Sequence, residues 1–145
     1  MSLTIQEVID RANKAFNNHD LNAFMELSAP DSVFRGPGGV VLRGRDEIRE
    51  FTAAWFEAFP DARSDMRRTM IVDNTVVGEG VFTGTHTGVF RTPAGDLPPT
   101  GKAVKGAFME IFDVEDGLVV RDHMMFDRLD LLTQLGVIPG VEVAA

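Results

Sequence analysis

The spacing of hydrophobic residues divides the chain into a helical first part and a strand-rich second part. Apolar residues recur at helical spacing over residues 4–17, 21–27 and 48–59. The first of these segments opens with a capping-box pattern, and Pro60 directly follows the last one. The pattern therefore predicts three helices before residue 60.

From Ala62 onward the hydrophobic period shifts towards two, which is typical of strands. The predicted strands cover residues 66–72, 75–87, 102–114 and 118–126, with a further short strand at 33–35. Turn-forming residues separate them, including Asp116-Gly117 and the Pro- and Gly-rich segment 92–101. Three helices followed by hairpin-connected strands predict an α+β fold with the helices on one face of a mostly antiparallel sheet.

Length and composition narrow the classes of protein that fit this pattern. A chain of 145 residues suits a single domain, with a core at about 4–136 and a tail at 137–145. The chain has no cysteine, so disulfides and thiolate chemistry are excluded. With 22 acidic and 14 basic residues the net charge is −8, which disfavours nucleic acid and anionic membranes as partners. We expect a soluble, cytoplasmic protein, because no apolar run approaches membrane-helix length.

Asp127 is the main candidate for chemistry, because it lies where the last strand becomes a short amphipathic helix. If the strand stays regular, Asp127 shares one face with Arg121, His123 and Met125. On a cavity wall it would be buried among apolar groups, which would raise its pKa and suit it to acid/base catalysis. The alternative is that Asp127 only caps the following helix.

Other polar residues have weaker patterns. His123 could polarise a substrate carbonyl or simply fill a half-buried position, and His86 could face a pocket. Glu110 lies between Phe108 and Phe112 on one strand face, so either that face is wet or a buried carboxylate has a partner. No spacing of His, Asp or Glu supports a metal site.

Four strings, in this order and spacing, resemble the SnoaL-like polyketide (ester) cyclases of the nuclear transport factor 2-like superfamily. They are residues 59–61 (FPD), 84–88 (GTHTG), 98–102 (PPTGK) and 116–136 (DGLVVRDHMMFDRLDLLTQLG). The resemblance implies a cone-shaped half-barrel, in which a curved sheet wraps around three helices and a short C-terminal helix follows. It also implies a homodimer formed through the outer face of the sheet, which would make Glu79, Glu110 and Arg121 surface or interface charges.

The resemblance further implies a cofactor-independent enzyme that closes a ring in an apolar ester or carbonyl substrate by intramolecular aldol condensation, or catalyses a related isomerisation. The acid/base residue of that family falls on Asp127. The sequence departs from the family at Arg121 and His123, where an acidic residue and Trp are usual, and this puts the substrate class in doubt. The expected pocket is lined by large apolar side chains: Phe34, Trp55, Phe59, Phe90, Phe108, Met109 and Met125.

Two alternatives stay open from the residues alone. One is a non-catalytic module that binds a small hydrophobic ligand or dimerises. The other is an epoxide-hydrolase-like enzyme, which would need Arg121 or Arg35 to point inward beside acidic residues. A ketosteroid-isomerase-like site fits less well, because the chain has no Tyr.

Overall fold

A computed structural model describes residues 2–92 and 94–138. The helices and the 3-10 turn of this part are α1 Ile5–Asn17, α2 Leu21–Glu26, η1 Pro37–Gly39, α3 Gly44–Ala58 and α4 Arg128–Gln134. The strands are β1 Ser28–Gly36, β2 Val40–Arg43, β3 Arg63–Val72, β4 Thr75–Thr85, β5 Phe90–Thr92, β6 Gly95–Leu97, β7 Ala103–Glu115 and β8 Leu118–Phe126. Within those ranges no helix has the length and apolar character needed to cross a lipid bilayer.

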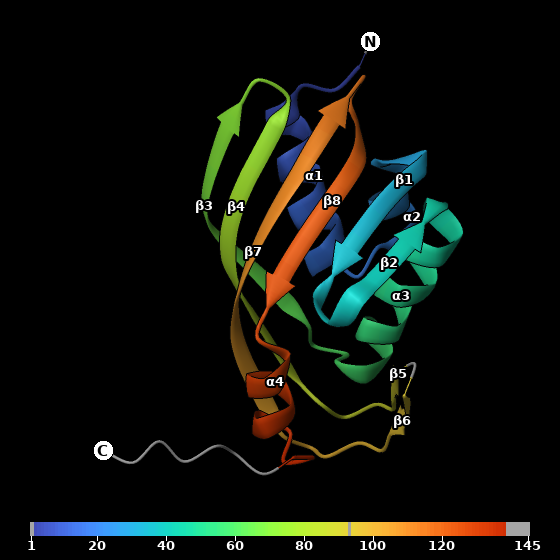
Figure 1. Cartoon of the computed structure of the whole chain (residues 1–145), viewed down its shortest axis with the longest axis vertical. Coiled ribbons are helices and arrows are strands. Elements are labelled where there is room, and N and C mark those ends of the chain that lie inside the picture. The colour runs from blue at the N-terminus through green and yellow to red at the C-terminus, as the bar shows by residue number, and fades with distance from the viewer. Residues whose placement is uncertain (1, 93, 139–145) are drawn as a thin grey trace.

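The main sheet has the strand order β2-β1-β8-β7-β4-β3, and it is open because the edge strands β2 and β3 do not pair. Only β1 and β8 run parallel; the other neighbours are antiparallel. Helices α1, α2 and α3 lie against one face of the curved sheet, and α4 lies beyond the end of β8 (Figure 1). The predicted α+β half-barrel with a short C-terminal helix is confirmed.

Local sequence explains where the helices begin. The Thr4 side chain accepts a hydrogen bond from the Glu7 backbone N–H at 3.1 Å and so caps α1. Asp20 caps α2 in the same way, through the Ala23 N–H at 3.0 Å. The three predicted N-terminal helices are therefore present, and their bounds differ from the predicted ones by a few residues.

Two irregularities bend the sheet around the helices. In β3 the register with β4 shifts between Met66 and Arg68, so Arg67 is an extra residue. In the β7–β8 pair Val114 faces Val119 and Asp113 faces Arg121, so Val120 is an extra residue on β8. Such bulges increase the local twist and exchange the two faces of a strand from that point on.

The β7–β8 turn follows its predicted chemistry. Asp116 and Gly117 have φ values of 51° and 75°, the two left-handed positions that a two-residue hairpin turn requires. Other connections were harder to predict. Strand β2 and the small β5–β6 hairpin were not expected, because both are too short to show a hydrophobic period. Of the predicted tail, residues 139–145 lie outside the described part of the chain.

The buried core forms two clusters at opposite ends of β7. One cluster contains Phe112 and Val114 with Val8, Ile9 and Val76, and the other contains Val104 with Ala58, Phe59, Ala62 and Leu135. The inward-facing residues of β7 between these two clusters line a cavity instead. The fold thus packs tightly at both ends and leaves space in the middle.

Candidate active site

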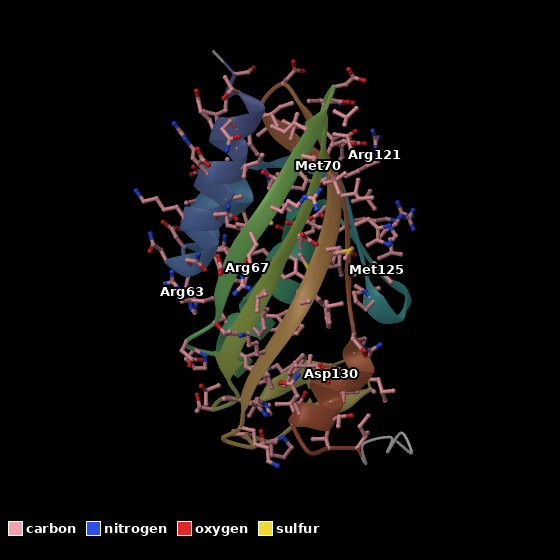
Figure 2. The ribbon with its side chains drawn as sticks, turned by 90° about the vertical axis from the view of Figure 1, so that its left-hand side faces the viewer. Arg63, Arg67, Met70, Arg121, Met125 and Asp130 are labelled. Atoms are coloured by element: carbon pink, nitrogen blue, oxygen red, sulfur yellow. The ribbon has the colours of Figure 1, made fainter. Side chains whose placement is uncertain are left out.

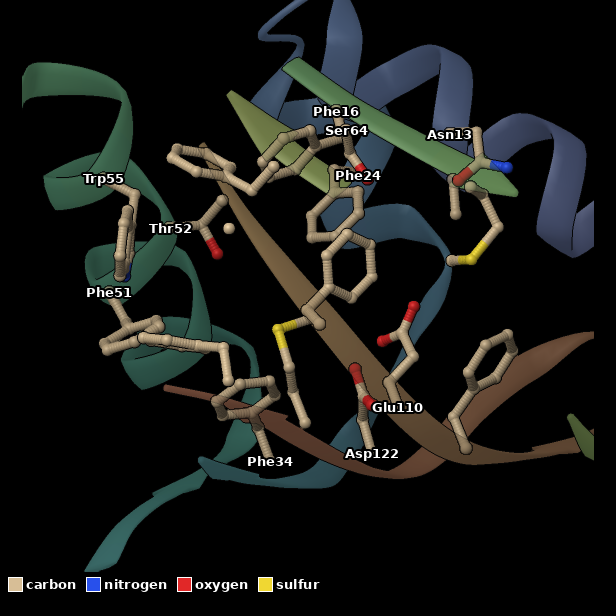
Figure 3. A pocket seen from close by; sticks show the side chains of 18 of the residues that line it. Asn13, Phe16, Phe24, Phe34, Phe51, Thr52, Trp55, Ser64, Glu110 and Asp122 are labelled. Atoms are coloured by element: carbon tan, nitrogen blue, oxygen red, sulfur yellow. The ribbon is translucent and has the colours of Figure 1, made fainter. Parts of the chain in front are cut away.

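A cavity of about 470 Å³ lies between the concave face of the sheet and the helices. This volume is in the range of sites that hold small organic molecules. Its wall is mostly apolar and includes many aromatic side chains: Phe16, Phe24, Phe34, Phe51, Trp55, Phe82, Phe108, Phe112 and Phe126. Rings from α1, α2 and α3 face rings from the sheet across this space (Figure 3).

Gly80 makes room for part of this aromatic wall. A Cβ atom there would lie 2.6 Å from the Asp65 carbonyl oxygen and 2.7 Å from Cζ of Phe108. Both distances are shorter than real contacts allow, so a larger residue would displace either the bulged strand β3 or the Phe108 ring. Glycine at this position lets the ring of Phe108 lie over β4.

Two carboxyl groups, those of Glu110 and Asp122, lie inside this apolar cavity. Glu110 faces inward from β7 and Asp122 from β8, on diagonally adjacent positions, since Glu110 pairs with Met124 and Asp122 with Phe112. The two side chains share a hydrogen bond. Figure 3 shows both carboxyl groups together on the sheet side of the cavity, below the ring of Phe24 and to the right of Phe34.

Burial controls the protonation of this pair. Loss of hydration raises the pKa of Glu110, and the hydrogen bond from Asp122 offsets part of that rise. The pKa of Asp122 is raised well above its ordinary value, first by burial and then by the neighbouring Glu110 carboxylate. Oδ1 of Asp122 is buried and accepts no hydrogen bond from the described residues, which also favours the neutral acid. Both shifts therefore favour the neutral form of the carboxyl groups in this pair.

The mouth of the cavity lies beside α4, where Lys105, Asp127 and Asp130 line it and are exposed. Gln134 fastens α4 to β7 with two backbone hydrogen bonds, from its Nε2 to the Lys105 carbonyl and from the Lys105 N–H to its Oε1, both 2.9 Å. Leu131 adds an apolar contact on the inner side of α4. The opening is thus polar, in contrast to the interior.

Asp127 lies at this mouth and not in the interior. Its Oδ1 accepts a hydrogen bond of 2.9 Å from the Asp130 N–H, so it is the N-cap of α4, and its side chain is exposed. The predicted burial of Asp127 among apolar groups is therefore wrong. The cap, which was the alternative interpretation, is the role that its contacts give it.

The bulge at Val120 explains the error in the predicted face. Val119 lines the cavity, as it would in a regular strand. After the extra residue Val120 the alternation is reversed, and the side chains that line the cavity are those of Asp122, Met124 and Phe126. His123, which was expected on the same face as Asp127, is exposed on the outer face, where it pairs with Ile111 across the strands.

His86 is fully buried, but it packs against Phe59 and Phe90 and does not line the cavity. Its Nδ1 accepts a hydrogen bond from the Thr100 N–H at 3.2 Å and lies 3.0 Å from the Thr100 hydroxyl. Burial lowers the pKa of His86. The residue holds the segment before β7 to the end of β4, so the prediction that it faces the pocket is wrong.

The predicted pocket residues separate into three groups. Phe34, Trp55 and Phe108 line the cavity. Phe59 and Phe90 belong to the packed core at one end, where Trp55 stacks on Phe59 and meets Phe90 edge to face. Met109 and Met125 are 62% and 54% exposed on the outer face, so their assignment to the pocket is wrong.

Sequence reasoning assigned Glu110 to the surface and passed over Asp122. The position of Glu110 between Phe108 and Phe112 was the available signal, because it required a partner for a buried carboxylate. Asp122 could have been predicted as that partner only if the position of the bulge at Val120 had been known.

The epoxide-hydrolase-like alternative lacks its arginine. Arg121 points outward and forms an ion pair with Asp113 at 2.8 Å, and Arg35 is exposed. Among residues 2–92 and 94–138, no arginine lines the cavity, and no three His, Asp or Glu side chains are grouped in a way that could hold a metal ion.

The open, curved sheet wrapped around three helices (Figure 1) is the α+β half-barrel that the resemblance to the nuclear transport factor 2-like superfamily implies. The sequence profile of the SnoaL-like polyketide cyclases matches residues 6–135. The chain therefore belongs to the SnoaL-like polyketide cyclase family.

Several solved structures share this fold. IdmH from Streptomyces antibioticus, a candidate polyketide cyclase, is 26% identical, with a TM-score of 0.77 over 92% of this chain and 99% of IdmH. AclR from Streptomyces galilaeus, a candidate hydroxylase, is 24% identical, with a TM-score of 0.80 over 95% and 84%. A candidate SnoaL-like cyclase from Jannaschia sp. CCS1 is 21% identical, with a TM-score of 0.81 over 93% of each chain.

The likeness to the last two structures concerns the fold alone, because their sequence identity is low. Their assigned reactions also differ, so the fold does not select one chemistry. A search among curated protein sequences finds no match.

Proposed function

We propose that this protein is an acid/base enzyme that acts on an apolar carbonyl compound in the cavity, and that the Glu110–Asp122 pair supplies the acid and the base. The observation that carries the proposal is a pair of carboxyl groups that β7 and β8 bring together inside an apolar cavity large enough for a small organic molecule. Membership of the SnoaL-like family supports ring closure as the reaction. Isomerisation would need the same groups.

The chemistry of the pair matches an intramolecular aldol reaction. The Glu110 carboxylate removes a proton from the carbon beside a substrate carbonyl, and the Asp122 carboxylic acid donates a hydrogen bond to the oxygen as it becomes an enolate. The enolate carbon then forms a bond to a second carbonyl carbon of the same molecule. The resulting alkoxide takes the proton back from Glu110, so no atom is lost and nothing is oxidised.

The cavity favours this proton transfer in two ways. Burial raises the pKa of the carboxyl pair, which makes its ionised member a stronger base than a carboxylate in water. The aromatic wall excludes water and would hold a flat apolar substrate by contact with its rings. Asp127 has neither advantage, because it is exposed and already accepts the hydrogen bond that caps α4.

Proton exchange tests this proposal without knowledge of the natural substrate. An aryl ketone such as α-tetralone is incubated with the protein in deuterated buffer, and the loss of its α-proton signal is followed by nuclear magnetic resonance. Glu110→Gln and Asp122→Asn should each reduce the protein-dependent rate by about 10²–10⁴-fold, the usual contribution of a positioned acid or base.

Glu79→Gln is the matched control, because it removes the same charge from the outer face of β4. Asp127→Asn tests the residue that the family resemblance favours. A large loss in Asp127→Asn with normal exchange in Glu110→Gln would move the chemistry to the mouth. Equal rates in all variants would instead favour a module that binds a hydrophobic ligand without reaction.

The outer face of the sheet supports a second proposal, that two copies of the chain associate through it. Met109 and Met125 are direct neighbours across β7 and β8, and Ile111 is 52% exposed beside them. Figure 2 shows Met125 with Met70 and Arg121 on this outer side. Exposed apolar patches of this kind often mark protein interfaces.

Sedimentation of the wild-type chain should therefore show a dimer, and Met109→Lys with Met125→Lys should give a folded monomer. Val41→Lys, at an exposed apolar position on the edge strand β2, should leave the mass unchanged. A wild-type monomer at 100 μM would contradict this second proposal.

A further inference from the structure

The carboxyl pair has no cationic partner in the cavity. Among the described residues, neither Glu110 nor Asp122 takes part in an ion pair, and the titratable side chains that line the same cavity are Lys105, Asp127 and Asp130. These three are exposed at the mouth. Helices α1, α2 and α3 and strands β1, β3 and β4 present only uncharged groups to the cavity.

Asp122 also keeps an unused acceptor. Its Oδ1 is buried and meets no donor from the described residues, although buried carboxyl oxygens nearly always find one. The aromatic wall supplies the second half of a cation site. Ring faces carry a negative electrostatic potential and attract ammonium groups, most strongly where water is excluded. Glu110 itself lies on β7 between the rings of Phe108 and Phe112.

We propose that the cavity binds a hydrophobic ammonium ion, with its cationic head beside Glu110 and Asp122 and its apolar body among the rings. This goes beyond the proposed function, because it needs no turnover and names a charged class of ligand. The cation supplies the positive charge that the pair lacks. A cavity of about 470 Å³ accommodates a head group and one aromatic ring.

Binding of a cation should release a proton from the pair. The ligand's positive charge favours the ionised carboxyl groups and lowers their pKa values, so the pair binds fewer protons once the ammonium has entered. Affinity for a permanently charged ligand should therefore increase as pH is raised from 5 to 8. A neutral ligand of the same shape should show neither effect.

Benzyltrimethylammonium and neopentylbenzene provide this matched pair, because they differ only by nitrogen or carbon at the branched centre. Titration calorimetry of the full chain in buffers of different ionisation enthalpy measures both affinity and proton release. We expect proton release with the cation alone, and an affinity for the cation that rises about tenfold between pH 5 and 8. In Glu110→Gln and in Asp122→Asn the cation should lose at least tenfold in affinity, while neopentylbenzene should keep its affinity within threefold.

Retained binding of neopentylbenzene also shows that the variants fold. Glu79→Gln, on the outer face, should leave both ligands unaffected. The inference is overturned if the cation fails to bind at millimolar concentration, binds without proton release, or binds Glu110→Gln as well as wild type.

The α-proton exchange assay on the same preparations separates the two proposals. Exchange without ammonium binding removes only this inference, and ammonium binding without exchange removes only the proposed reaction.

Discussion

Asp113 and Asp122 lie near one another on the β7–β8 ribbon, yet their surroundings give the two carboxyl groups opposite properties. On the outer face Asp113 accepts a hydrogen bond from the Thr75 hydroxyl at 2.7 Å and pairs with Arg121, and these contacts lower its pKa. On the inner face Asp122 has apolar neighbours and a second carboxyl, and its pKa is raised. One hairpin thus carries Asp113, whose surroundings favour the carboxylate, on one face and Asp122, whose surroundings favour the neutral acid, on the other.

The face of the strand on which a carboxyl group lies, and not its residue type, therefore decides whether its pKa is lowered or raised here. Both faces of β7 and β8 mix apolar and acidic side chains. Only the inner one is covered by helices, so only its acids lose their water. Predictions that separate the two faces therefore test the site assignment directly.

The largest expected effect is on packing. Phe112→Ala, on the inner face of β7, should lower the free energy of unfolding by about 3–5 kcal/mol, because it removes a buried ring from the cluster with Val8 and Ile9. Ile111→Ala, on the outer face of the same strand, should cost less than about 0.5 kcal/mol in a monomer. Urea unfolding measures both. A larger cost for Ile111→Ala that grows with protein concentration would instead show that the outer face is an interface.

The next largest change in the free energy of unfolding is expected when both carboxyl groups of the pair are replaced. Glu110→Gln together with Asp122→Asn should raise the free energy of unfolding at pH 8 by about 1–3 kcal/mol, because no charge then has to be buried. The sign follows from proton uptake. Above the ordinary carboxyl range near pH 4, the folded pair holds more protons than the unfolded chain, so wild-type stability falls as pH rises through the raised pKa.

Denaturation between pH 4 and 8 checks this slope. The gain of the double variant should be largest at pH 8 and should shrink as pH falls towards 4, because both pKa values are raised and lower pH favours the neutral acids. A gain that is the same at every pH would contradict the buried pair.

How much of this was predictable depends on how local each feature is. The helices and the Asp116-Gly117 hairpin follow from caps, spacing and turn chemistry within a few residues, and these predictions agree with the structure. The cavity residues depend on strand faces. A single extra residue, Val120, reverses the faces of β8. Asp122 therefore faces the cavity, where Asp127 was predicted, and Met125 lies on the outer face.

The bulge leaves no sequence signal, because Val120 is an ordinary strand residue between another valine and an arginine. Register there is decided by the packing of β8 between β1 and β7, which is a long-range property. Glu110 was the part of the site that the sequence pattern could have predicted. Its two flanking Phe residues required either a wet face or a buried partner, and the second reading was correct.

The cap at Asp127 provides a smaller effect. Asp127→Ala should lower the free energy of unfolding by about 1 kcal/mol, since the Asp130 N–H loses its acceptor. Asp127→Asn keeps a capping oxygen and should cost only a few tenths of that amount. Thermal denaturation of the two variants compares them directly. An equal loss in both would mean that charge at Asp127, and not capping, stabilises α4.

The smallest effect is expected at the outer ion pair, the counterpart of the buried acids. Arg121→Ala should lower the free energy of unfolding by about 0.2–1 kcal/mol, because the Arg121 side chain is 64% exposed and solvent screens the pair. Asp113 has a lowered pKa, so this contribution is present above the ordinary Asp range and is lost as pH falls through the lowered value. A double-mutant cycle of Arg121→Ala with Asp113→Asn isolates the interaction, and 1 M salt should weaken it. A coupling that survives high salt would mean that the outer face is shielded from water, as it would be between two copies of the chain.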